Sequence, residues 1–215
     1  MRLFTAVVLM GALSSTSIWA QSHLEPEDSP FSSALTHYYS AVGKTLLDDV
    51  PGYALSVVAI PSFEVEWAAW ILHEPVPKAC SRAAARPIWN GGNPSKPNLP
   101  RRPPTPKCAA LSRQLADDLQ ELWAAMLRQV RIPPPSSVIT LDGISYHFSA
   151  NDKFQNLAGQ VANPEPDTAT GRLAEAAMAL RAYSTAPSPE SERALCRMVA
   201  AVRPEGSALR TRCTS

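Results

Sequence analysis

The stretch 53-YALSVVAIPSFEVEWAAWIL-72 decides the fold that the sequence predicts. Its two parts, 53–60 and 63–72, contain many β-branched and aromatic residues, which favour β-strands. In 63–72 the apolar side chains alternate with polar ones, so they would share one face and leave Glu64 and Glu66 on the other. Pro61 interrupts the run between the two strands. A hairpin between them is therefore open but not established by the pattern.

A second hairpin is indicated by the stretch 138-VITLDGISYHFS-149. Asp142-Gly143 is a strong two-residue turn signal, and it would place 138–141 beside 144–149. In this register Tyr146 and Phe148 face the core. His147 lies on the other, half-polar face, which would meet water or a partner.

Apolar residues recur at helical spacing in segments before, between and after these predicted strands. A first helix begins at Ser29-Pro30 and a second, with a long apolar stripe, covers 106–132. After a loop over 150–170, two more helices close the chain, the last beginning at Ser188. The fold class is therefore α+β, with a mainly antiparallel sheet of four or more strands. The 106–132 helix and the C-terminal helices would pack on one face of this sheet.

The first 20 residues have the layout of a secretory signal peptide, with a positive start, an apolar run and a small polar exit that ends at Ala20. The apolar run is shorter than the about 20 residues that span a bilayer. We expect cleavage after Ala20, a periplasmic or secreted location and one domain over 21–215. Since no later run of 18 apolar residues occurs, we expect no membrane span after signal removal.

Charge is unevenly divided along the chain. The net charge is +1, but residues 21–75 carry −7 and residues 76–215 carry +7. Such an internally dipolar domain can steer a charged partner. It lacks the single-sign footprint of a nucleic-acid binder, so no nucleic-acid partner is expected.

Four cysteines remain after the signal, which in an oxidising compartment indicates disulfides. Structural zinc is the competing interpretation, but the chain lacks the close CxxC or CxxH pairs that zinc sites favour. Proximity in sequence favours Cys80–Cys108 and Cys196–Cys213. The four histidines are too scattered to suggest a metal site, so neither a metal nor a cofactor is expected.

A proline-rich basic loop is expected over 82–107. Prolines recur there every third residue, which would align them along one edge of a polyproline II helix. This segment is a candidate binding surface for a protein partner; its candidate residues are Pro94, Pro97, Pro100, Arg101, Arg102 and Pro103. The competing interpretation is a stiff surface loop tied at its base by Cys80–Cys108.

Common catalytic motifs, such as GxSxG, SxxK and HExxH, are missing from the chain. The best catalytic candidates are Glu66 and His147, which could share the polar face of one sheet. A carboxylate that orients an imidazole is the beginning of acid–base catalysis. We expect a non-enzymatic binding or interaction protein of the cell envelope, and the alternative is a small periplasmic hydrolase that uses Glu66 and His147.

Three short islands carry a resemblance: PSFEVEW at 61–67, LDGISYHF at 141–148 and Gly171-Arg-Leu173. They resemble a recurring pattern, PSFxxEW and LDGxxYxF, in exported bacterial proteins of unknown function. The resemblance implies a bacterial periplasmic or secreted setting. It implies no activity and no site residues.

Overall fold

The computed structural model of the protein describes residues 23–27, 35–73, 75–89, 96–132, 142–152 and 155–202. The predicted signal peptide and its cleavage site at Ala20 lie outside the described residues, as does the predicted helix start at Ser29-Pro30.

A six-stranded antiparallel sheet forms the centre of the molecule, in the order β4-β3-β2-β1-β5-β6. Its strands are β1 (Leu55–Pro61), β2 (Trp67–Leu72), β3 (Lys78–Ala83), β4 (Lys107–Ala110), β5 (Ile144–Asp152) and β6 (Gln155–Ala162). The 53–72 stretch does form a hairpin, β1–β2, in which Leu55 lies opposite Ile71. This stretch lies at the centre of the sheet because its residues are apolar enough to be buried on both faces.

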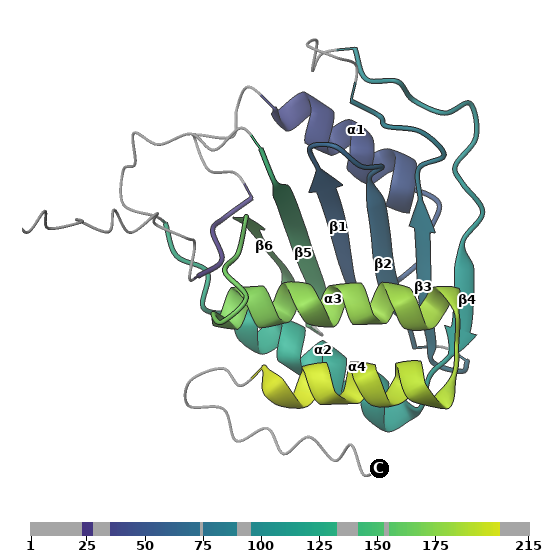
Figure 1. Cartoon of the computed structure of the whole chain (residues 1–215), viewed down its shortest axis with the longest axis vertical. Coiled ribbons are helices and arrows are strands. Elements are labelled where there is room, and N and C mark those ends of the chain that lie inside the picture. The colour runs from purple at the N-terminus through teal and green to yellow at the C-terminus, as the bar shows by residue number, and fades with distance from the viewer. Residues whose placement is uncertain are drawn as a thin grey trace, which may run out of the picture.

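Helices cover both faces of the sheet (Figure 1). The helices α2 (Arg113–Leu127), α3 (Ala169–Thr185) and α4 (Pro189–Ala201) lie on one face. The helix α1 (Thr36–Leu47) lies on the other. The α+β class, the antiparallel sheet and the packing of the later helices on one face are thus confirmed.

The larger core lies between the sheet and α2–α4. Tyr146 and Phe148 of β5 are buried in it, as the sequence predicts. The indole of Trp123 on α2 meets the ring of Phe148 edge-on, with centroids 5.7 Å apart. The apolar stripe of α2, which includes Trp123, therefore belongs to the core on this face of the sheet.

A smaller core lies on the opposite face, under α1. Tyr38, Val42 and Leu46 follow each other at four-residue spacing and bury one side of this helix against Val58 and Trp70. The His147 face, which was expected to meet water or a partner, is covered in part by α1 of the same chain.

The predicted pairing of 138–141 with 144–149 is wrong. Residues 138–141 lie outside the described residues, and both edges of β5 are taken by β1 and β6. Gly143 is needed for another reason: its φ is +133°, and an added Cβ would meet the side chain of Asn163 at 1.6 Å. That amide accepts from the Ile144 N–H (2.7 Å) and donates to the Asp142 carbonyl (3.0 Å). Asp142-Gly143 thus lies directly before β5, next to the side chain of Asn163.

Three boundaries differ from the prediction. The 106–132 helix is shorter, because Lys107–Ala110 pairs with β3 as strand β4. Ser112 is the true N-cap of α2, and its hydroxyl accepts from the Leu115 N–H. The predicted loop over 150–170 contains the end of β5, the whole of β6 and the start of α3. The start of α4 after Ser188 is confirmed, with a capping box between Ser188 and Ser191.

The two edges of the sheet are formed by β4 and β6. The outer strand β4 has four residues and is joined to β3 by the Cys80–Cys108 disulfide (S–S 2.04 Å). At the other edge, the backbone of Glu25 exchanges two hydrogen bonds of 2.8 Å with Gln160 of β6. The first predicted disulfide is thus confirmed. The second depends on Cys213, which lies outside the described residues.

Candidate functional site

Glu66 is buried, with 1% of its surface exposed, although the alternation pattern placed it on a solvated face. Its carboxylate accepts from the Tyr38 hydroxyl (2.5 Å) and from the N–H groups of Ile88 (2.8 Å) and Trp89 (3.1 Å). Burial and the hydrogen bond to Glu66 together hold the pKa of Tyr38 well above its usual range. Glu66 therefore ties α1 and the segment after β3 to the start of β2.

Glu66 and His147 lie on the same face of the sheet but have different partners. Ala68 and His147 both flank Val58 of β1, on either side. Among the described residues no hydrogen bond or ion pair joins Glu66 to His147. Since both carboxylate oxygens of Glu66 are already occupied, the geometry gives no support to an acid–base pair made of these two residues.

His147 instead lies in a cavity between α1 and the sheet. We call this space, which has a volume of about 610 Å³, the α1 cavity. Its lining includes Tyr39 and Gly43 of α1, Ser56 and Val58 of β1, and His147 and Ser149 of β5. A volume of this size falls in the range of small-molecule sites, about 300–1,000 Å³.

The imidazole of His147 is neutral at physiological pH, since burial lowers its pKa from 6.5 to about 4. Its ring lies 4.8 Å from the ring of Tyr39, and its Nδ1 lies 3.9 Å from a carboxylate oxygen of Glu27. Its Nε2 is buried and has no hydrogen-bond partner among the described residues. A buried polar atom without a partner destabilises the folded state, and it is often explained by a ligand or an ordered water.

Two serine hydroxyls lie in the same cavity. Ser56 and Ser149 are opposite each other in the β1–β5 register, and their Oγ atoms are 2.7 Å apart. In this pair one hydroxyl donates its hydrogen to the other. The hydroxyl that accepts keeps its own hydrogen, which it can donate to a ligand. The lining of the cavity therefore combines apolar side chains with polar and charged ones, among them Glu27, Lys44 and Asp48.

Gly43 forms part of the wall that α1 contributes. It lies inside the helix, where a glycine is less stable than an alanine by about 1 kcal/mol. Its φ is not positive, and an added Cβ would have no neighbour within 4 Å. Neither the backbone nor the packing thus requires glycine here. Its effect is to leave the cavity open on the side of α1.

The cavity was not identified from the sequence, apart from His147. Serines on strands and a glycine in a helix are each common, and no spacing joins residues 39–43, 56 and 147–149. Gly43 was the one available signal, because it interrupts an otherwise apolar helical pattern.

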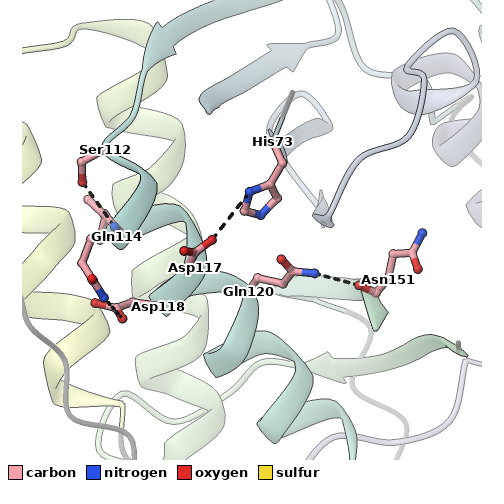
Figure 2. A network of polar contacts seen from close by, with 8 residues as sticks. His73, Ser112, Gln114, Asp117, Asp118, Gln120 and Asn151 are labelled. Carbon is pink, nitrogen blue, oxygen red and sulfur yellow. Dashed lines mark hydrogen bonds and ion pairs between the residues drawn. The ribbon is translucent and has the colours of Figure 1, made fainter. Parts of the chain in front are cut away.

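Ser62 and His73 do not line the α1 cavity. The Ser62 hydroxyl accepts from the Gly143 N–H. His73, just after β2, points toward α2, where its Nδ1 lies 3.8 Å from Asp117 (Figure 2). On the same helix, Gln114 donates to Asp118, and Gln120 donates to the carbonyl of Asn151 (Figure 2). These contacts connect α2 to its surroundings and lie apart from the α1 cavity.

The proline-rich segment between β3 and β4 is not one continuous polyproline II helix. The Leu99 N–H donates to the Pro97 carbonyl (3.0 Å), and the Asn98 N–H donates to the Ile88 carbonyl (2.7 Å). A polyproline II helix has no such internal bonds. Pro97 and Pro100 are half-buried, Arg101, Arg102 and Pro103 are exposed, and Pro94 lies outside the described residues. Binding of a protein partner by this segment stays a prediction.

Among the described residues, no group of three or more histidine, cysteine, aspartate or glutamate side chains is arranged to hold a metal ion. No helix in the same part of the chain is both long and apolar enough to cross a membrane. Comparisons with family models, with curated proteins and with solved structures found no match to this chain.

Proposed function

We propose that this protein is an exported, non-enzymatic binding protein whose small-molecule ligand occupies the α1 cavity. The observation that carries the proposal is the α1 cavity itself, which is lined in part by His147, a residue whose buried Nε2 has no hydrogen-bond partner among the described residues. The export part rests on the sequence of residues 1–20.

The lining of the cavity indicates the class of ligand. His147 is neutral and offers one donor and one acceptor, and the Ser56–Ser149 pair offers one more donor. Val58 and Tyr39 supply apolar and aromatic contact surface. We therefore expect a ligand that carries hydroxyl or amide groups on an apolar frame.

Native mass spectrometry of the protein, incubated with a small-molecule extract of cells and then desalted, tests this proposal. Gly43→Leu should fill the cavity from the side of α1 and abolish the bound mass. His37→Leu places the same side chain at an exposed position of α1 that does not line the cavity, and it should retain the ligand.

An unliganded mass for the unaltered protein, or an equal bound mass in the Gly43→Leu variant, would contradict binding in the α1 cavity. Conversion of the bound compound into products during incubation would instead indicate the hydrolase alternative.

A further inference from the structure

A second pocket lies on the opposite face of the sheet, between α3 and the turn that joins β1 to β2. It has a volume of about 370 Å³, and we call it the α3 pocket. Trp67 and Tyr146 contribute to its lining from the sheet, and Arg181 from α3. None of the residues that line it also lines the α1 cavity, so the two sites are separate.

The cationic group of this pocket is the guanidinium of Arg181. It is stacked over the indole of Trp67, with 4.8 Å between its central carbon and the ring centroid. Partial burial lowers the pKa of Arg181, but the group stays charged at physiological pH. Among the residues that the structure describes, Arg181 forms no ion pair. The guanidinium is thus held in position by Trp67 without an ion pair among the described residues.

The anionic group of the pocket is the exposed carboxylate of Glu64. It interacts electrostatically with both Arg181 and Tyr146 without forming an ion pair with the guanidinium. One positive and one negative group therefore line the same pocket without neutralising each other directly.

The rest of the pocket includes apolar side chains that are open to solvent. Phe63 is 82% exposed and Met178 is 46% exposed, and Ile144 also lines the pocket. A ligand that covers exposed apolar side chains around a pocket is bound more tightly, by about 25 cal/mol for each Å² of apolar surface that it buries.

We propose that the α3 pocket binds a free α-amino acid with an apolar side chain. The planar guanidinium of Arg181 takes the α-carboxylate, which it can bind through two parallel hydrogen bonds. Glu64 takes the α-ammonium group. Phe63, Ile144 and Met178 surround the side chain. A simple anion would be repelled by Glu64, and a simple cation by Arg181, so the charge pattern selects a zwitterion.

Calorimetric titration of the unaltered protein with L-phenylalanine and its derivatives tests the charge pattern. N-acetyl-L-phenylalanine lacks the positive charge and L-phenylalaninamide lacks the negative one. Each should bind at least about tenfold more weakly than L-phenylalanine, because one charged group of the pocket is left without its partner. Glycine, which lacks the apolar side chain, should also bind more weakly.

Variants locate the site. Arg181→Gln and Glu64→Gln should each weaken L-phenylalanine binding by about tenfold or more. Arg113→Gln removes the same charge from an exposed residue that does not line the pocket, and it should bind normally. Gly43→Leu should also bind normally, so that failure of this site and failure of the α1 cavity can be told apart.

Equal affinity for L-phenylalanine and its two derivatives, or unchanged affinity in Arg181→Gln, would overturn the proposal. No measurable binding of L-phenylalanine or L-leucine at millimolar concentration would do so as well. Since the derivatives are tested on the unaltered protein, the result does not depend on the folding of any variant.

Discussion

Glu66 is a buried carboxylate whose hydrogen-bond donors are a tyrosine hydroxyl and two backbone N–H groups rather than a basic side chain. These three donors come from α1 and from the segment after β3, which are far from Glu66 in sequence. Because a buried charge is tolerated only when such donors are present, Glu66 makes the positions of these two segments depend on each other.

Glu66→Ala should therefore lower the free energy of unfolding by at least about 3 kcal/mol, since it leaves one hydroxyl and two N–H groups buried without an acceptor. Tyr38→Phe removes one hydrogen bond and should cost only about 1 kcal/mol. Glu64→Ala is the matched control, because Glu64 is exposed two residues earlier. Urea unfolding measures all three, and an equal small loss for Glu66 and Glu64 would contradict the structural role of Glu66.

His147 should make the stability depend on pH. Its folded-state pKa, lowered by burial to about 4, lies below the value of 6.5 expected in the unfolded chain. Between these two values the unfolded chain binds more protons, so the free energy of unfolding falls as the pH falls through this range. The loss amounts to about 3 kcal/mol below pH 4.

Urea unfolding at several pH values checks this prediction. His147→Gln should flatten the profile between about pH 6.5 and 4, whereas His37→Gln, at an exposed position of α1, should leave it unchanged. Identical pH profiles for His147→Gln and the unaltered protein would show that His147 is not buried in its neutral form.

At the level of single elements, the sequence predicts those whose apolar residues repeat over many positions. The two strands within 53–72, the stripe of α2 and the core face of β5 are recovered for this reason. The strands β3 and β6 are not predicted, because polar residues obscure their apolar alternation. These residues are Ser81 and Arg82 in β3, and Gln155 and Asn156 in β6. β6 pairs along its length with β5, and tertiary pairing rather than local preference makes it a strand.

The element α1 can be stabilised by a single change. Gly43→Ala should raise the free energy of unfolding by about 0.5–1 kcal/mol, because alanine has the higher helix propensity and the added methyl group has open space. Thermal unfolding measures the gain. Gly52→Ala offers a useful contrast, since the positive φ of Gly52 (+54°) makes the same substitution unfavourable there. A loss of stability in Gly43→Ala would mean that the cavity wall is more tightly packed than described.

The outer pair β3–β4 depends on the Cys80–Cys108 disulfide, which closes a loop between residues 28 positions apart. The double variant Cys80→Ser/Cys108→Ser should lose about 3–4 kcal/mol, the entropy of closing such a loop in the unfolded chain. Urea unfolding of the double variant, compared with the oxidised parent, gives this value. A loss below about 1 kcal/mol would show that pairing along β4 is sufficient without the covalent link.

In the whole molecule, the acidic residues 21–75 and the basic residues 76–215 do not form separate units. β1 belongs to the acidic part, yet it pairs with β5 from the basic part along its full length. Charge division along the chain thus predicted nothing about the arrangement of the fold. The candidate site could not be predicted from the sequence either. The α1 cavity combines residues of α1, β1 and β5, which are far apart in sequence and meet only in the folded sheet.

The two faces of the sheet should differ in local stability. The core under α2–α4 contains most of the large buried side chains, whereas α1 covers a smaller core and has the α1 cavity beneath it. Its N-cap residue, Leu35, also makes no capping hydrogen bond. In hydrogen-exchange mass spectrometry, the amides of α1 should therefore exchange at a lower opening free energy than those of α3. Equal protection of both helices would contradict this view, and a ligand of the α1 cavity should slow exchange in α1.

The edge strands of the sheet, β4 and β6, affect how the protein interacts with other copies of itself. Unpaired strand edges are templates on which other chains add further strands and polymerise. Here one edge is a four-residue strand that follows directly after Pro106, and the other is met by the Glu25 bridge. A proline has no N–H to offer to an incoming strand, and Glu25 occupies a position where one would begin. Glu25 thus covers the outer edge of β6 at Gln160, and a chain trimmed past residue 25 should expose this position to neighbouring copies.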